Sequence, residues 1–211
     1  MNPVQLGKSA MPRKPDPVLE KKIVAAAARL LDRGGEEAIT LRAVAKEAGT
    51  TTPTIYERFH DRDELIRQVV VLATEQIMAV LQPKLSIEGM FEEYLRYCRA
   101  YPMRLNLTVG TFGKRYVAGE PMPAFDLLRF RITTQIGIKG KECEDLALTI
   151  ASLAFGTAQG VIAAGKRTRH AAEFQRASLH ALRMLLGAFS RKKAALRAPR
   201  SRPRGINQKH Q

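Results

Sequence analysis

The eighteen residues "AGTTTPTIYERFHDRDEL" (48–65) contain signals for the end of one helix, a complete short helix and the start of a third. Gly49 is a typical residue at the C-terminal end of a helix, and Thr51 and Asp61 are typical N-caps. Pro53 is compatible with the first turn of the helix that Thr51 begins. A helix of about eight residues is unstable alone in water, so this one must be held by packing against its neighbours.

The short helix has one apolar and one polar face. Ile55 and Phe59 are four residues apart, so they can pack together against the apolar face of the preceding helix, "LRAVAKEAG" after the cap Thr40. The side chains left facing outward are Thr52, Thr54, Tyr56 and Arg58. Two packed helices with such a polar face are typical of a helix-turn-helix, whose second helix enters the major groove of DNA. Two ordinary packed helices of a bundle are the alternative.

The rest of the chain also shows the spacing of helices, with no sustained two-residue alternation. The sequence therefore predicts an all-α fold of about nine helices: an N-terminal three-helix helix-turn-helix domain and a C-terminal helical regulatory and dimerisation domain. The expected boundaries are a disordered arm at 1–15, the DNA-binding domain at 16–66, the ligand-binding and dimerisation domain at 67–191, and a disordered basic tail at 192–211.

The formal net charge of +15 indicates a polyanionic partner, but it is unevenly distributed. The last 21 residues carry eight lysines and arginines and no acidic residue, so more than half of the net charge lies in the tail. A solubilising end and an arm that binds DNA without sequence preference are equally compatible with this composition.

Several functional classes lack their sequence signals. Cys98 and Cys143 have no paired spacing, which suits a reducing cytoplasm, and no stretch of 18 apolar residues predicts a membrane span. "GVIAAGK" (160–166) matches the spacing of a phosphate-binding loop, but Arg167 stands where that loop needs Ser or Thr. We therefore expect a cytoplasmic protein that is not an enzyme and that uses no metal or cofactor.

Two long helices near the C-terminus, about 142–166 and 170–193, have stripes that suit helix-on-helix packing. The first has a small-residue stripe that includes Ala151, Ala154 and Ala158, and the second has a large apolar stripe formed by Leu179, Leu182, Leu186 and Phe189. Small residues permit close approach of helices, as in four-helix dimer interfaces. We interpret these stripes as a dimer interface, and packing within the chain is the alternative.

The segment "TLRAVAKEAGTTTPTIYERFHDRDEL" (40–65) resembles the DNA-binding signature of the TetR family of transcriptional regulators. The matching positions are Thr40, Ala45, Ala48, Gly49, Thr51, Thr54, Ile55, Tyr56, Phe59, Arg62 and Leu65. The resemblance implies that Thr51, Thr52, Pro53, Thr54 and Tyr56 touch DNA, with the tyrosine on phosphate, and that Arg62 lies near phosphate. Thr40 and Arg42 fit either a phosphate contact or an ordinary cap and surface arginine. Thr50, Pro53 and Arg62 depart from the commonest family residues, which leaves base specificity open.

The same resemblance implies a homodimer that binds a palindromic operator in double-stranded DNA, and most simply a repressor released by a small-molecule effector. The family places its effector pocket among helices that correspond to about 86–138. The candidate lining residues are Tyr97, Tyr101, Phe112, Tyr116, Phe130, Phe155 and Gln159. Two alternatives remain: a DNA-binding regulator without a small-molecule effector, and an α-helical enzyme whose first helices imitate the motif.

Overall fold

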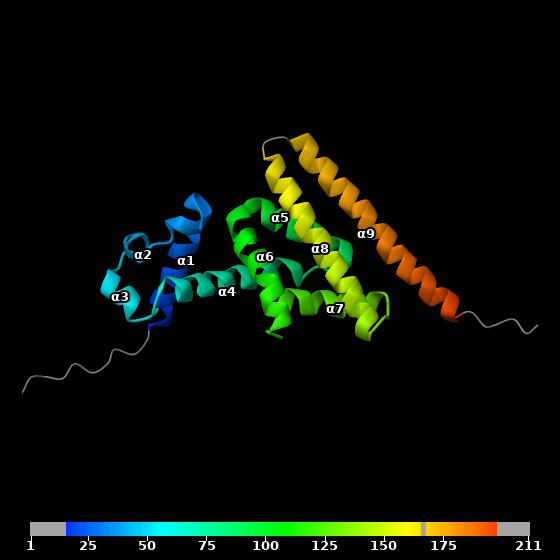
Figure 1. The fold of residues 1–211 in the computed structure, drawn as a ribbon, viewed down its shortest axis with the longest axis horizontal. Helices are drawn as coiled ribbons and strands as arrows, with labels where there is room; N and C mark the ends of the chain where they lie inside the picture. Colours follow the sequence, from blue (N-terminus) through cyan, green and yellow to red (C-terminus); the bar gives the residue numbers. More distant parts are fainter. Residues whose placement is uncertain (1–15, 166–167, 198–211) are drawn as a thin grey trace, which may run out of the picture. The chain divides into compact units, whose positions relative to one another are not determined.

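A computed structural model describes residues 16–165 and 168–197, and every regular element in this part of the chain is helical (Figure 1). The elements are α1 (Pro17–Gly34), the short 3-10 helix η1 (Glu36–Ala38), α2 (Leu41–Ala48), α3 (Thr52–Tyr56), α4 (Arg62–Leu81), α5 (Ile87–Ala100), α6 (Pro102–Val117), α7 (Pro123–Gln135), α8 (Gly140–Ala164) and α9 (Thr168–Arg197). The predicted all-α class, with its N-terminal helix-turn-helix, is confirmed.

The chain divides into two compact units. The first unit comprises residues 1–76 and 101–118, so it contains α1, α2, α3, most of α4, and α6. The second unit comprises residues 77–100 and 119–211, which contain α5, α7, α8 and α9. The association of α6 with the first unit has no counterpart in the predicted domain ranges. Those ranges stay a prediction, and the predicted arm at 1–15 lies outside the described residues.

Side-chain caps define the helix boundaries of the first unit. Asp16 accepts hydrogen bonds from the backbone N–H groups of the first turn of α1, and Thr40 accepts one from Ala43 N at 3.2 Å. At the start of α4, Glu64 N donates to Asp61 Oδ1 at 2.7 Å, while the Glu64 carboxylate accepts from His60 N at 2.7 Å. Asp61 therefore caps α4, as its residue type predicts, and Glu64 satisfies the backbone N–H that precedes the cap.

A single apolar cluster fills the first unit between α1, α2, α3 and the start of α4. Its largest fully buried members are Ile23, Leu31, Ile39, Ile55, Phe59 and Leu65. The apolar residues of α1 and α2 recur at the spacing of one helix face, so burying that face orients both helices around α3.

The second unit is organised around α8, which packs against α5, α7 and α9. Helices α8 and α9 form an antiparallel hairpin, shown from yellow to red in Figure 1. Among the described helices, α8 is the one long and apolar enough to cross a membrane, but 44% of its most apolar stretch is buried in the protein. Its composition is therefore explained by its central position in the packing.

Helix α9 extends to Arg197, beyond the predicted composition break after residue 191. The segment "KKAALR" (192–197) consists of strong helix formers, so basic character alone does not end the helix. The rest of the predicted tail, 198–211, lies outside the described residues.

Candidate nucleic-acid interface

The turn between α2 and α3 is fixed by backbone and side-chain hydrogen bonds. Gly49 has φ 65° and ψ 41°, a left-handed conformation that glycine adopts without strain. Thr50 N then donates to Ala45 O at 2.9 Å and closes the end of α2. Thr51 Oγ1 accepts from Thr54 N at 3.3 Å and begins α3. The chain therefore reverses within three residues and presents α3 as a separate short helix.

Helix α3 is held from its inner side. Ile55 is fully buried and Phe59 is 1% exposed, as the four-residue spacing predicts. The regular helix covers only five residues, fewer than predicted, but Phe59 N still donates to Ile55 O at 2.9 Å. The turn that follows α3 therefore continues the helical path far enough to bury Phe59.

The outer side of α3 carries most of the polar residues that the sequence pattern indicates. Tyr56 is 57% exposed, Thr51 and Pro53 are exposed, and Thr52 is half-buried. The hydroxyl of Thr54 forms a hydrogen bond of 2.9 Å with that of Thr51, so these two threonines also stabilise the helix start. This face has the size and chemistry of a major-groove reader, with hydroxyls and an amphipathic ring on a supported helix.

Thr40 and Arg42 lie at the start of α2, the first helix of the motif. The Thr40 hydroxyl acts as the N-cap of α2, and the Arg42 side chain is exposed. A phosphate contact by either residue stays a prediction.

Arg58 does not occupy the outward position that the sequence pattern predicts. Its side chain is only 14% exposed. Its Nη1 donates to Thr54 O at 3.4 Å, and its Nε is buried without a hydrogen-bond partner. The Arg58 side chain folds back over the C-terminal end of α3, where a cation interacts favourably with the helix dipole.

Arg62, the first residue of α4, binds the segment before α2. Its Nε donates to Ile39 O at 2.8 Å and its Nη2 donates to Glu36 O at 2.7 Å, while Nη1 lies 3.5 Å from Glu36 Oε1. All three guanidinium nitrogens therefore have a partner within the chain. The phosphate contact implied by the family resemblance stays a prediction for this residue.

Two charged features near the motif have no signal in the sequence. Glu47 of α2 binds Arg29 at 2.9 Å and Arg33 at 2.6 Å, both on α1. The hydrogen bonds from Arg29 and then Arg33 hold the pKa of Glu47 below its usual value. The Nζ of Lys22 lies 3.8 Å from where a Cβ on Gly49 would be, beside the turn into α3. No local sequence pattern indicates the Glu47 ion pairs or the position of Lys22, because both depend on how α1 crosses α2.

The predicted effector-pocket residues are divided between the two units. Tyr101, Phe112 and Tyr116 belong to the first, where the rings of Phe112 and Tyr116 stack with centroids 6.3 Å apart. Tyr97, Phe130, Phe155 and Gln159 belong to the second. Tyr97 is buried, Phe155 lies 6.1 Å from the Tyr94 ring, and Phe130 and Gln159 are exposed. A shared pocket stays a prediction.

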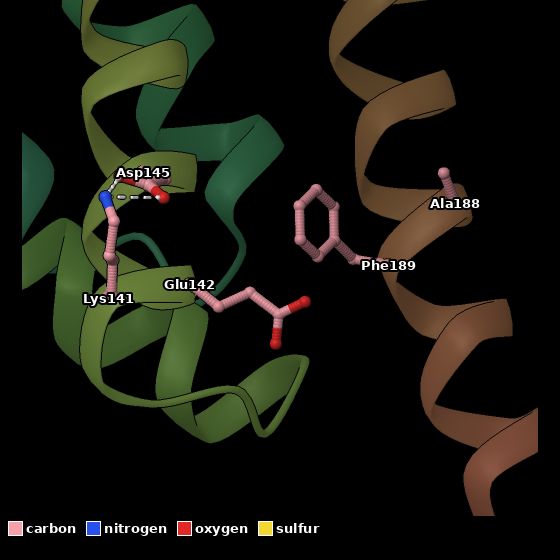
Figure 2. Close-up of a pocket in the computed structure, with 5 residues that line it drawn as sticks. All are labelled: Lys141, Glu142, Asp145, Ala188 and Phe189. Atoms are coloured by element: carbon pink, nitrogen blue, oxygen red, sulfur yellow. Dashed lines mark hydrogen bonds and ion pairs between the residues drawn. The ribbon is translucent and has the colours of Figure 1, made fainter.

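A hollow of about 540 Å³ does occur within the second unit, between the start of α8 and the end of α9. It is lined by Lys141, Glu142, Asp145, Ala188 and Phe189. Figure 2 shows the Glu142 carboxylate and the Phe189 ring facing each other across the gap between these helices. None of the predicted effector-pocket residues lines it, and three of its five side chains are charged.

The predicted dimer-interface residues are mostly buried within the single chain. Ala158 and Leu182 are 1% and 0% exposed, Ala151 and Ala154 are buried, and Leu179, Leu186 and Phe189 are half-buried. Packing between α8 and α9, the alternative left open by the sequence, accounts for Ala158 and Leu182. A different stripe of α9 is open: Phe174 and Met184 are 49% and 61% exposed, with Ala177 and Ala188 exposed and Ala181 half-buried on the same face.

Two findings concern metal-binding and thiol groups. Within 16–165 and 168–197, no group of three His, Cys, Asp or Glu residues could hold a metal ion. Both cysteines are buried free thiols, and burial raises the pKa of Cys98 to about 12. Cys98 is therefore protonated at neutral pH and unsuited to act as a nucleophile.

The comparisons with known proteins agree with this geometry. Residues 23–69 match the model of the family described as bacterial regulatory proteins, tetR family. Among curated protein sequences, none matches this chain.

Solved structures show the same fold over most of the chain. A TetR-family transcriptional regulator from Streptomyces coelicolor has a TM-score of 0.65 at 14% identity, covering 86% of this chain and 87% of its own. The regulator SCO7222 from the same organism has a TM-score of 0.62 at 17% identity, covering 81% and 97%. A TetR variant from Acinetobacter baumannii AYE, solved in complex with minocycline, has a TM-score of 0.59 at 17% identity, covering 85% and 99%.

The match over residues 23–69 identifies the helix-turn-helix as that of a DNA-binding transcriptional regulator. Residues 23–69 therefore match a DNA-binding domain of the tetR-family type, and the solved structures show the same fold over most of the chain.

Proposed function

We propose that the protein is a homodimeric transcriptional repressor that binds a palindromic operator through α3 of each subunit and is released by a small-molecule effector. The observation that carries this proposal is the face of α3. Its inner residues Ile55 and Phe59 are buried, while Tyr56 is 57% exposed beside Thr52 and Pro53. The supported helix therefore presents hydroxyl groups and an amphipathic ring to solvent, a set that suits contact with base edges and phosphates in the major groove.

The side chains of this face fit different classes of DNA contact. The Thr52 hydroxyl can donate to or accept from a base edge, so it suits sequence reading. The Tyr56 hydroxyl suits a phosphate oxygen, which positions the helix without carrying sequence information. Lys22, beside the turn into α3, adds a cation that suits a second phosphate. Arg58 and Arg62 serve the motif by holding its helices.

A dimer brings two such faces onto one operator, and the open stripe of α9 is the surface we assign to the partner subunit. Phe174 lies on Gly160 of α8, where a Cβ would come within 2.7 Å of the ring. Gly156, one turn earlier on α8, has open space around it. In a two-fold dimer, the large side chains of α9 in one subunit can pack against the open position at Gly156 of α8 in the other. The same surface then serves both subunits, as a two-fold interface requires.

Effector release requires that the ligand bind the DNA-incompetent state more tightly than the DNA-bound state. The fold shared with a TetR solved in complex with minocycline supports an effector for this chain. The alternative, a regulator without a small-molecule effector, is favoured by the charged lining of the hollow in the second unit. A thermal-shift screen of small molecules separates the two, because an effector raises the melting temperature of the protein without DNA. In either case the protein acts on DNA in the cytoplasm and catalyses no reaction.

The test of DNA reading is a selection from a pool of random-sequence duplexes with the wild-type protein, followed by footprinting. We expect an inverted repeat with half-sites about 10 base pairs apart, or a multiple of this spacing. Thr52→Ala should then relax the preference at one position in each half-site by about 1–3 kcal/mol. Thr134→Ala, which changes an exposed threonine of α7, is the matched control and should change nothing. A pool that shows no enrichment contradicts the proposal.

A further inference from the structure

Arg104, in the first turn of α6, is a buried arginine with partners on two other helices of the first unit. It is 7% exposed. Its Nε lies 2.9 Å from Asp32 Oδ1 and its Nη2 lies 2.5 Å from Asp32 Oδ2, which is the two-pronged geometry of a strong arginine–carboxylate pair. Its Nη1 donates to the Gln76 side-chain oxygen, and its guanidinium carbon lies 4.2 Å from the centre of the Tyr101 ring. One side chain therefore joins α6 to α1 and to α4.

The buried residues of α6 lie near its start. Arg104 and Leu105 are the buried residues of α6, and both lie in its first turn. The later residues Gly110 and Gly113 have open space around them. Leu107, one turn later, packs partly buried against the apolar cluster of the unit, so the buried part of α6 lies in its first two turns.

Both helices that Arg104 binds also hold the helix-turn-helix. Asp32 lies between Arg29 and Arg33 in α1, and those two arginines bind Glu47 of α2. Gln76 lies in α4, whose first residue, Arg62, binds the carbonyls that precede α2. Helices are stiff over such lengths, so a change where Arg104 binds shifts α1 against α4 and moves the support of α2 and α3.

We propose that Arg104 is a positioning residue for DNA binding: by clamping Asp32 of α1 to Gln76 of α4, it sets the orientation in which α3 is presented to the operator. The inference rests on the proposed role of α3 as the DNA reader. A purely structural pair would raise the melting temperature and leave the affinity of the folded protein unchanged. A positioning pair changes the affinity of protein that is fully folded, because a misoriented α3 cannot bind its base edges.

The test uses the full-length chain and the duplex that wild type enriches from a random pool. Arg104→Met removes the charge and keeps most of the volume. Exchanging the two partners, Asp32→Arg with Arg104→Asp, restores an ion pair of opposite direction between α1 and α6. Arg99→Met, a change at an exposed arginine of α5, is the matched control. Affinity is measured at a temperature where circular dichroism shows each variant fully folded.

We expect folded Arg104→Met to bind the selected duplex about tenfold more weakly than wild type, and the exchanged pair to recover most of this loss. Asp32→Asn should lower the melting temperature more than Arg104→Met does, because it leaves a buried guanidinium without its counter-charge. If Arg104→Met is unfolded at every usable temperature, Gln76→Leu takes its place. This change removes the hydrogen bond from Arg104 to α4 and keeps the ion pair of Arg104 with Asp32.

Wild-type affinity in the folded variant would overturn the positioning role, and so would a weakening that the exchanged pair does not recover. Failure of the proposed function is distinguishable, because wild type would then enrich no duplex before any variant is made.

Discussion

Both units of this protein have a buried apolar core, but they differ in the polar interactions that join their helices. In the first, helices are joined by directional polar interactions: Glu47 of α2 with two arginines of α1, Arg62 with two backbone carbonyls, and Arg104 with Asp32 and Gln76. In the second, the long helices α8 and α9 pack through buried side chains such as Ala158 and Leu182. Ion pairs also join helices there, such as Arg129–Glu144 at 3.0 Å and Arg183–Glu88 at 3.2 Å, but these arginines are more exposed than Arg104.

The difference follows from helix length and from what each unit does. Helix α3 has five residues and cannot be oriented by a long packing seam, whereas α9 has 30 residues. Apolar packing is tolerant of small shifts, while charge-assisted hydrogen bonds fix distance and direction. A DNA-binding helix needs its side chains placed accurately against base edges. The ion pairs and hydrogen bonds of Glu47, Arg62 and Arg104, here called the polar clamps, suit this need in the first unit.

The largest expected effect comes from removing the core anchor behind α3. Phe59 is 1% exposed, so Phe59→Ala should destabilise the first unit by about 3–5 kcal/mol and abolish operator binding. Leu182→Ala, which removes a fully buried side chain of α9, should instead destabilise the second unit by about 2–5 kcal/mol. Calorimetry and DNA binding measure the two effects. If calorimetry shows one unfolding transition, and both substitutions lower its midpoint temperature equally, the two units do not unfold independently.

The next expected effect is on assembly. Ala177→Lys with Met184→Lys places two ammonium groups on the open stripe of α9, and burying them unpaired at an interface costs several kcal/mol. We expect a folded monomer by light scattering, with operator affinity strongly reduced because the two half-sites are no longer bound together. Ser190→Lys, at an exposed position on another face of α9, should remain a dimer. A dimeric double variant would place the interface elsewhere.

Arg62 offers a smaller and more discriminating test of the polar clamps. Arg62→Met removes hydrogen bonds from a half-buried cation to two carbonyls and should cost the first unit about 1–2 kcal/mol of stability. The salt dependence of operator binding should stay unchanged if the arginine holds the fold. If it binds phosphate instead, the slope of log K against log salt should fall by about 0.9 for each phosphate that the protein no longer neutralises.

The smallest expected effect is the pH dependence of the Glu47 pair. The pKa of Glu47 is lowered in the folded protein, chiefly by its hydrogen bond from Arg29, so the charged form stabilises the folded state at neutral pH. This stabilisation is lost as the pH falls through the lowered pKa of the folded state. Thermal unfolding should show Glu47→Gln less stable than wild type at pH 7, with the difference shrinking below the ordinary pKa of a glutamate, about 4.3. A difference that stays constant at acid pH would show that the pair contributes no charge-dependent stability.

The local features of the fold are predictable from the sequence. The caps Thr40, Thr51 and Asp61 and the terminator Gly49 are found where the residue types indicate, because capping is decided within a few residues. The burial of Ile55 and Phe59 follows from their spacing in the same way.

The clamps are not predictable, because they join residues far apart in the chain. Arg104 and Asp32 are 72 positions apart, and Arg62 and Ile39 are 23 apart, so their pairing depends on helix crossings that no local pattern encodes. The outward position expected for Arg58 is wrong, because its side chain folds back to the carbonyl of Thr54 and is only 14% exposed. Leu182 packs within the chain rather than marking a partner surface, since one apolar stripe looks the same in either case.

The central claim is that α3 reads a sequence. Its most direct test is the ratio of dissociation constants for the selected duplex and for a scrambled duplex of the same length and composition, measured by fluorescence anisotropy at several salt concentrations. Both affinities should fall together as salt rises, while the selected duplex stays bound at least about a thousandfold more tightly. A ratio near one at every salt concentration would contradict the account, because the first unit would then bind only the phosphate backbone.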